Sequence, residues 1–425
     1  MDTITKIKRF FYPIGQGAFY AEKHQIGDEY FTIVYDCGTC RTCKTGQLKF
    51  AENVIEKAFK KDEVIDILFI SHFDYDHVSK IKKLKEHTNI KKVIMPLLHD
   101  TEKYLLSNIY RVLKFRNIVP LLENPEKFFG EDTDIIKVKP TDNTEIKLEP
   151  IVLNENMNGR ILESGQPLKI KDDSNWVFIP YNYEYKDRHI ELIKKLDNAG
   201  FNEQEIASLQ DGTVWTPEVF RRKRNSKKES NIVANVEERE SDRIEILDTK
   251  IFKNIYNTLT NHGKGTSVNE NSMLLYSGTL SIGEFKKNSY LFDLDKDIKW
   301  HDMLIKTDRV SCIYTGDTTL DVVDIKQAFK LFWEMVGTIQ IPHHGAKESF
   351  DKSILDDKGY CCPISVGTNP YKHPSKDVIE DIILQDSYPI FVSECLNSGF
   401  IECIDNKDYM KLKNLGCLSE LLYLK

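Results

Sequence analysis

The segment that most constrains the fold places four potential metal ligands directly after an apolar run. It spans residues 71–79, SHFDYDHVS, and its ligands are His72, Asp74, Asp76 and His77. The preceding residues 64–70, VIDILFI, predict a buried strand, and residues 78–86 predict the start of a helix. Imidazole and carboxylate groups are the donors that a borderline or hard divalent cation requires. The segment therefore predicts a metal site at the carboxyl end of a strand.

Two later segments repeat this arrangement. In residues 312–319, CIYTGDTT, an apolar strand runs into a glycine that permits a tight turn, and Asp317 follows it. In residues 339–349, IQIPHHGAKES, another apolar strand ends just before His343 and His344. Either segment alone is weak evidence, because paired histidines also occur on surfaces and in cores. Their shared position after apolar strands favours one common site with the first cluster.

These motifs together resemble the metallo-β-lactamase superfamily, and within it the soluble hydrolase domain of the competence protein ComEC and its stand-alone relatives. That branch carries SHxDxDH, TGD, HHGS and GNxYxHPS segments, which correspond here to residues 71–77, 315–317, 343–349 and 367–375. Weaker matches are FYPIGQG at 11–17, FTIVYDCG with its structural DCG at 31–38, and NENSMLLY at 269–276. The resemblance implies an α/β fold, the αββα sandwich, with a mainly helical insertion between its two halves.

The resemblance also implies a binuclear site in which the carboxylate of Asp317 bridges two divalent metal ions. The other ligands form two pairs, His72 with Asp74 on one ion and Asp76 with His77 on the second. A hydroxide held between two such ions attacks phosphorus in line, although it also attacks strained carbonyl groups.

The first of these pairs departs from the superfamily pattern. Asp74 stands where the wider superfamily has a second histidine, and a third histidine is not evident, because Asn269 or Asn271 occupies that region. This position is richer in oxygen than a three-histidine zinc site, so both Zn²⁺ and Mn²⁺ are candidates.

Three histidines near the end of the motif series have alternative roles. In one assignment His373 completes the metal shell, and His343 or His344 is the general acid for the leaving alcohol. In the reverse assignment the ligand comes from the His343 and His344 pair, and His373 carries the proton. A third interpretation is that the HPS sequence only caps a helix through Ser375. Asp76 is a candidate both as a ligand and as a catalytic group.

Three regions are expected along the 425-residue chain. Residues 1–150 form the first half of the sandwich, residues 151–255 form an inserted, partly helical region, and residues 256–425 form the second half. Within the last region, PIFVSE and GFIECI after Tyr388 predict two edge strands.

The insertion contains a basic run at residues 221–228, RRKRNSKK. The net charge of the chain is −7, so a nucleic acid would have to be bound by a local basic patch. A basic run on a loop is more often a solvated surface than a phosphate track. The inserted helices are also a candidate surface for a protein partner.

The compartment follows from what the sequence lacks. No apolar run approaches a membrane span, and no signal-like core follows the first residues, which favours a cytoplasmic protein without a membrane partner. Nine cysteines, an odd number, favour reduced thiols. Three of them, in CGTCRTC at residues 37–43, either hold a zinc ion or are incidental thiols, since no fourth ligand is adjacent.

The leading functional interpretation is a metal-dependent hydrolase, most specifically a phosphodiesterase or nuclease that acts on a nucleic acid or nucleotide. One alternative is hydrolysis of a lactone, thioester or other acyl bond, which the same superfamily supports. Another is a partner-dependent component of a bacterial defence or stress system.

Overall fold

The computed structural model describes residues 3–40, 45–142, 146, 149–153, 157–184, 187–215, 272–295, 305–320, 323–356, 358–367, 373–408 and 410. The chain forms two units. The first comprises Met1–Pro96, Asp132–Glu184 and Asn271–Lys425, and the second comprises Leu97–Glu131 and Tyr185–Glu270. The basic run at 221–228, the two asparagines at 269 and 271, and Cys43 lie outside the described residues.

This division differs from the three expected regions. The second unit takes residues 97–131 from the expected first half, and residues 151–184 of the expected insertion belong to the first unit. The helical unit is thus assembled from two segments that are separated along the chain.

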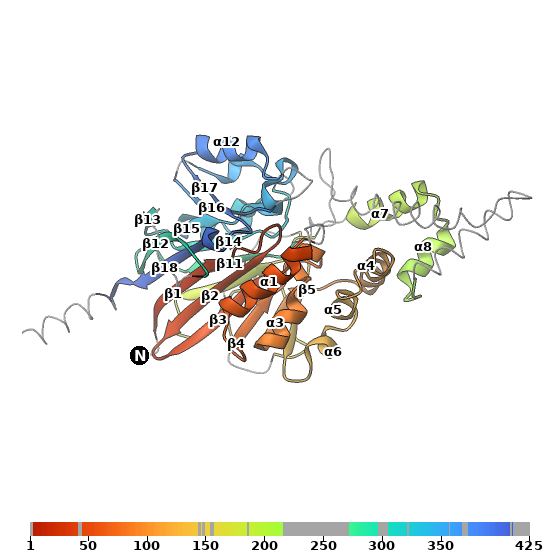
Figure 1. Ribbon diagram of the computed structural model, residues 1–425, viewed down its shortest axis with the longest axis horizontal. Coiled ribbons are helices and arrows are strands. Elements are labelled where there is room, and N and C mark those ends of the chain that lie inside the picture. The colour runs from red at the N-terminus through yellow and green to blue at the C-terminus, as the bar shows by residue number, and fades with distance from the viewer. Residues whose placement is uncertain are drawn as a thin grey trace, which may run out of the picture. The chain divides into compact units, whose positions relative to one another are not determined.

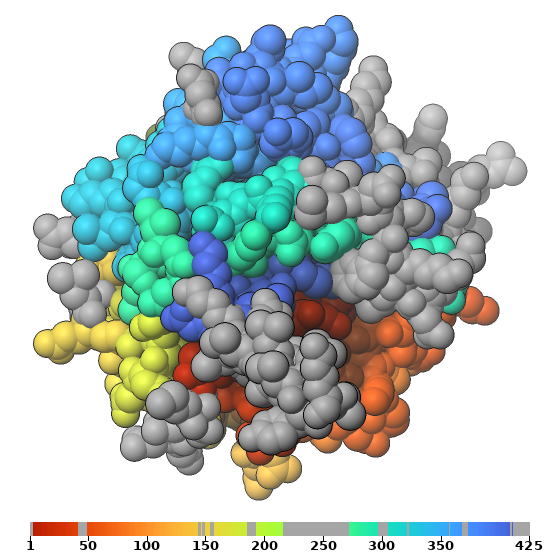
Figure 2. Space-filling view, turned by 90° about the vertical axis from the view of Figure 1, so that its left-hand side faces the viewer, coloured from red at the N-terminus to blue at the C-terminus, as the bar shows by residue number. Residues whose placement is uncertain are grey.

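The first unit contains a ten-stranded sheet with the order β13-β12-β18-β1-β2-β3-β4-β5-β6-β8 (Figure 1). In that order the strands are Ile305–Thr307, Phe285–Phe292, Gly399–Asn406, Ile4–Phe11, Phe19–Ile26, Glu29–Cys37, Val64–Phe69, Asn89–Pro96, Asp134–Val138 and Ile161–Leu162. Pairing is antiparallel from β13 to β3 and parallel from β3 to β8. Figure 2 shows part of this order on one face, where β12 and β13 (green) lie beside β18 (dark blue) and β1 (red).

The second sheet has eight strands in the order β17-β16-β15-β14-β11-β10-β9-β7. In that order they are Tyr388–Val392, Cys361–Ser365, Val336–Ile339, Ser311–Tyr314, Leu274–Thr279, Trp176–Tyr181, Leu168–Lys169 and Ile151–Val152. The strands β14 to β17 are parallel, so their carboxyl ends meet at one edge of the sheet.

The two sheets enclose one core, and a second core lies on the outer face of the eight-stranded sheet. Strand β10 shows the division, because Trp176 and Phe178 belong to the core between the sheets while Val177 and Ile179 belong to the outer core. Helices α11 (Ile325–Ala328) and α12 (Lys376–Leu384) contribute to the outer core. On the ten-stranded sheet, α1 (Thr45–Ala58) and α3 (Ile81–His87) lie over its strands (Figure 1). These layers confirm the predicted α/β sandwich.

Some predicted elements differ from the observed ones. Strand β17 lies at a sheet edge as predicted, but β18 does not, because it lies between β12 and β1. Its side chains Phe400, Glu402 and Ile404 are fully buried and face the other sheet. The helix after residue 324 is the short α11, and a 3₁₀ turn at Trp333–Met335 follows it.

A network of buried charged side chains joins the two sheets. The guanidinium of Arg9 donates to Glu22 Oε1 at 2.7 Å and to Glu402 Oε2 at 2.6 Å, and Lys287 Nζ donates to Glu402 Oε1 at 2.7 Å. All four side chains are completely buried. Arg9 also donates to the carbonyl oxygen of Val310 on the other side, at 3.0 Å. Two cations thus balance two anions in the interior, as a buried ionic cluster requires.

The second unit is helical in its described part. Its helices are α4 (Asp100–Val112), α5 (Val119–Glu123), α6 (Pro125–Phe129), α7 (Asp187–Asn198) and α8 (Glu203–Gln210). Asn108 of α4 donates to the carbonyl oxygens of Leu209 and Thr213, which ties the two chain segments together. None of the helices described in either unit combines the length and apolar composition needed to cross a bilayer.

Candidate metal centre

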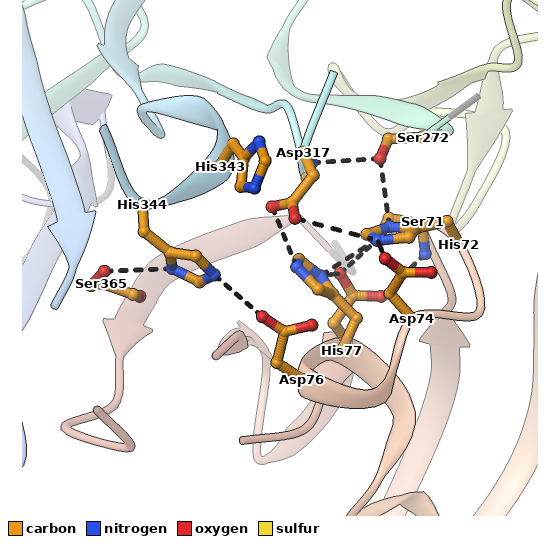
Figure 3. Close-up of polar contacts among 12 residues, drawn as sticks. Ser71, His72, Asp74, Asp76, His77, Ser272, Asp317, His343, His344 and Ser365 are labelled. Carbon is orange, nitrogen blue, oxygen red and sulfur yellow. Dashed lines mark hydrogen bonds and ion pairs between the residues drawn. The ribbon is translucent and has the colours of Figure 1, made fainter. Parts of the chain in front are cut away.

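The candidate ligands meet at the carboxyl ends of three strands, one from the ten-stranded sheet and two from the eight-stranded sheet. His72 and Asp74 follow β4, and the short helix α2 (Tyr75–Val78) carries Asp76 and His77. Asp317 follows β14, and His343 and His344 follow β15. Figure 3 shows these side chains pointing toward one another across the space between the strand ends.

His77 is held between two carboxylates. Its Nδ1 lies 2.8 Å from Asp36 Oδ2 and its Nε2 lies 3.0 Å from Asp317 Oδ1. A carboxylate can only accept, so Nδ1 carries a proton that it donates to Asp36. Burial alone would lower the pKa of His77, but Asp317 and Asp36 raise it well above its ordinary value. This second proton, on Nε2, is the one that a cation would displace on binding.

His72 has a buried ring nitrogen directed at two carboxylates. Its Nε2 makes no hydrogen bond within the described part of the chain and lies 3.9 Å from Asp74 Oδ2 and 4.0 Å from Asp317 Oδ2. Ser71 Oγ donates its only proton to Asp36, so His72 Nδ1 must donate to Ser71 Oγ, 2.9 Å away. Nε2 therefore presents a lone pair. Burial, followed by His77, lowers the pKa of His72 well below its ordinary value.

This geometry tests whether the residues suit a cation. Two ligands bonded to one ion at about 2.0–2.2 Å lie roughly 3–4 Å apart, which matches the separations around His72 Nε2. A buried imidazole lone pair beside two carboxylates is the donor set of a divalent cation. The residues therefore fit a metal ion at this position.

A second group of ligands also includes Asp317. One ligand atom from each of Asp76, His77, Asp317 and His344 lies within 4.8 Å of the others. His344 Nε2 is 3.2 Å from Asp76 Oδ2, and its Nδ1 is 3.1 Å from the carbonyl oxygen of Ser365, to which only an N–H can donate. The Nε2 atoms of both histidines thus face the group, which also fits a cation.

Asp317 lies between the two groups. Its Oδ1 faces His77 and its Oδ2 faces His72. Burial alone would raise the pKa of Asp317, but His77 and His343 lower it well below its ordinary value, so the side chain is a carboxylate. The backbone nitrogen of Asp317 donates to Ser272 Oγ at 3.0 Å, and Ser272 Oγ also lies 3.1 Å from His72 Nδ1.

His343 and His373 lie outside the four-residue group. Their rings face each other with centroids 5.6 Å apart, and His343 Nδ1 is 3.1 Å from Ser349 Oγ. Burial lowers the pKa of His343, and burial together with His343 lowers the pKa of His373 to about 4. Of the three histidines with alternative roles, the structure brings only His344 into the four-residue group.

The backbone is strained where it delivers these histidines. His343 and His344 have φ angles of 47° and 55°, the left-handed region that residues with a Cβ rarely adopt. Gly316 also has a positive φ, and an added Cβ would lie 3.0 Å from Ser272 Oγ. Such conformations persist only where the surrounding structure enforces them, as is common at functional sites.

The sequence predicts only a structural role for Asp36, whereas in the structure Asp36 orients His77. Its two oxygens accept three hydrogen bonds, from Ser71 N at 2.7 Å, Ser71 Oγ at 2.6 Å and His77 Nδ1 at 2.8 Å. One signal was available, because Asp36 ends a strand that neighbours β4, as the ligands do.

We expect Asp36→Asn to weaken metal binding and activity by roughly 10- to 100-fold, the usual cost of losing an outer partner of a ligand. Asparagine has one oxygen and one NH₂ group, so its NH₂ would face one of the three donors. Metal affinity measured by competition with a chromogenic chelator checks this, with the exposed Asp173→Asn as control. Equal affinities for the two variants would show that Asp36 does not act on the ligands.

Comparison with known proteins agrees with the fold. Residues 26–145 match the model of the metallo-beta-lactamase superfamily. The match includes Asp36 and the ligands from His72 to His77, whereas Asp317 and the later histidines lie beyond it. This part of the chain is thus similar to the metallo-beta-lactamase superfamily. No curated protein matches the chain.

Two similar solved structures are metallo-beta-lactamase proteins of bacteria. The metallo-beta-lactamase fold protein YhfI of Bacillus subtilis is 13% identical to this chain. Its TM-score is 0.20, and the match covers 43% of this chain and 54% of YhfI. A candidate metallo-beta-lactamase of Thermotoga maritima is 11% identical, with a TM-score of 0.20 over 49% of this chain and 91% of that one. The chain thus spans about half the length of YhfI.

Proposed function

We propose that this protein is a metal-dependent phosphodiesterase or nuclease with a binuclear site. One observation carries the proposal: the two oxygens of Asp317 face two separate groups of buried ligands, with His72 and Asp74 on one side and His77 on the other. When bound, a pair of divalent cations supplies Lewis-acid chemistry that suits in-line displacement at phosphorus.

The donor set supports a hard or borderline ion. Three carboxylates and three imidazoles would hold the two cations, from Asp74, Asp76, Asp317, His72, His77 and His344. A set this rich in oxygen suits Mn²⁺ as well as Zn²⁺. The resemblance to a branch that handles DNA favours a phosphodiester over an acyl substrate.

We assign proton transfer to His343 and His373, which lie beside the metal ligands without joining the four-residue group. Their lowered pKa values keep both rings neutral at pH 7. A neutral imidazole accepts a proton first and can return it to a leaving alcohol afterwards. The contact between His343 Nδ1 and Ser349 Oγ fixes the orientation of the first ring.

Metal analysis and a substrate panel test the proposal together. Protein purified without chelator is expected to contain two metal equivalents, and one equivalent would contradict the binuclear site. After reconstitution with Mn²⁺ or Zn²⁺, we expect cleavage of single-stranded DNA, RNA or cyclic dinucleotides, and none in the presence of excess chelator. Hydrolysis of lactones or thioesters with no cleavage of any phosphodiester would favour the acyl alternative instead.

A further inference from the structure

The outer face of the ten-stranded sheet carries a band of lysines. Alternation along β1 buries Ile7, Arg9 and Phe11 between the sheets, so the side chains of Lys6 and Lys8 lie on the opposite face. The strand register continues this face on both sides. Lys8 is opposite Lys23 of β2, and Lys6 is opposite Asp405 of β18, which is itself opposite Lys286 of β12.

One more lysine extends this surface, which we call the lysine band. Residues that are opposite each other on neighbouring strands lie on the same face of the sheet. Lys306 of β13 is opposite Asn288 of β12, which is opposite Cys403 of β18, which in turn is opposite Lys8 of β1. Lys306 and Lys8 therefore lie on the same face. The members of the lysine band are therefore Lys6, Lys8, Lys23, Lys286 and Lys306. A contact with Lys306 lowers the pKa of Lys286, as expected for two ammonium groups held together.

The lysine band leads into a cavity of about 800 Å³ on the same face. Lys8 and Lys23 line it together with Lys57 and Lys60, which lie at and just after the end of α1. Two carboxylates also line the cavity, Glu63 paired with Lys23 and Asp295 paired with Lys57. The lysines outnumber them, and neither Lys8 nor Lys60 has an ion pair among the described residues. In a chain of net charge −7, this is a local excess of positive charge.

Aromatic side chains form part of the cavity wall. Phe10 and Tyr12 are buried and stack with centroids 5.4 Å apart and planes 4° apart. Tyr30 differs, because 60% of its surface is exposed at the rim. An exposed ring beside a row of lysines offers a flat apolar face and phosphate contacts at the same place.

The cavity is separate from the candidate metal centre. Val64, the first residue of β4, lines the cavity, whereas the ligands follow the last residue of that strand. At about 3.3 Å per residue, the six residues of β4 place the two sites roughly 20 Å apart. A ligand that occupies both sites would have to span roughly 20 Å.

We propose that the lysine band and its cavity bind single-stranded nucleic acid, with the phosphates on the lysines and one base stacked on Tyr30. Lysine ammonium groups neutralise backbone phosphates without reading sequence. A base can stack on Tyr30 only if it is exposed, as the bases of a single strand are. The proposal goes beyond hydrolysis and does not require it, so binding can be measured on protein stripped of metal.

The test is fluorescence anisotropy of a labelled oligothymidylate with the full chain in chelator, over a range of salt concentrations. We expect Tyr30→Ser to weaken binding about tenfold, the loss of one stacked base, and Tyr30→Phe to retain affinity. For the double variant Lys8→Gln with Lys60→Gln, the slope of log affinity against log salt should fall by about 1.4, two phosphate contacts at about 0.7 each. Replacing the same two lysines by arginine should preserve the slope.

Matched controls use exposed residues elsewhere in the first unit. The double variant Lys82→Gln with Lys330→Gln removes the same charge, and Tyr388→Ser removes an exposed tyrosine from an edge strand. Affinities and slopes that do not differ between the cavity variants and these controls would overturn the proposal. Binding of inorganic phosphate, a mononucleotide or anionic phospholipid vesicles with an affinity equal to that of the oligonucleotide would also overturn it.

The outcome is independent of the proposed function. If the protein binds the oligonucleotide through these residues but cleaves no substrate after metal loading, only the proposed hydrolase activity is overturned. If the protein cleaves cyclic dinucleotides but the cavity variants do not change oligonucleotide binding, only the proposal that the lysine band binds nucleic acid is overturned.

Discussion

Asp317→Ala is expected to abolish the proposed metal-dependent hydrolysis and to remove at least one of the two metal equivalents that the proposed binuclear site would hold. Its carboxylate faces both ligand groups, so its loss affects both metal positions at once. The effect should exceed the roughly 10- to 100-fold expected for an outer partner such as Asp36, because a direct ligand is lost. Steady-state hydrolysis and metal content of the purified variant measure this.

Folding must be separated from chemistry in this experiment. Removing Asp317 takes away a buried negative charge, so we expect the far-UV circular dichroism spectrum of the variant to match that of the wild type. The exposed Asp132→Ala is the matched control and should keep full activity and both metals. Wild-type activity with two bound metals in Asp317→Ala would exclude the bridging role.

Arg9→Met is expected to destabilise the first unit by about 3–5 kcal/mol, the cost of leaving a buried charge without its partner. The substitution leaves Glu22 and Glu402 in the core with Lys287 as the remaining cation of the network. It also removes the donor to Val310 of the facing sheet. Urea unfolding followed by tryptophan fluorescence measures the loss, since Trp176 lies in this core.

The exposed Arg160→Met is the control for Arg9→Met and should change stability by less than about 0.5 kcal/mol. The pH dependence gives a second check. Burial alone would raise the pKa values of Glu22 and Glu402, but Arg9 and His24 lower that of Glu22, and Lys287 and Arg9 lower that of Glu402. Their contribution is therefore present above the unfolded value of about 4.3 and is lost as the pH falls below it. In Arg9→Met, the free energy of unfolding should fall less steeply as the pH is lowered through this range. A pH dependence equal to that of the wild type would contradict the ionic network.

The strand ends explain why much of the metal centre could be predicted from the sequence. The ligands of residues 71–77 and Asp317 follow apolar strands, so each could be assigned to a strand's carboxyl end. The two strands lie in different sheets, and only the resemblance predicted that these ends meet. The division of the histidines could not be predicted in the same way. His344 meets Asp76 across 268 residues, and which of two adjacent imidazoles turns inward depends on two left-handed backbone positions.

The buried network and the contacts within the helical unit could not be predicted, for related reasons. Arg9 stands between Ile7 and Phe11 on the inward face of β1, so strict alternation did indicate a buried charge, but its partners lie on β2 and β18. Similarly, residues 97–131 and 187–215 both contain helices, yet nothing local in the sequence indicates that Asn108 of one segment binds Leu209 of the other. Contacts between distant segments are not encoded in periodicity.

The central position of β18 has a consequence for the synthesis of the chain. Strand β1 leaves the ribosome well before β18, its partner on one side, because Arg9 and Glu402 are 393 residues apart. At about 5–20 residues per second, β1 waits roughly 20–80 s for that neighbour. During this time one edge of β1, with Arg9 unpaired from Glu402, has no strand beside it and can join another chain. The nascent protein is therefore most prone to aggregation before β18 emerges, and protection of β1 by a chaperone over that interval would raise the yield of folded protein.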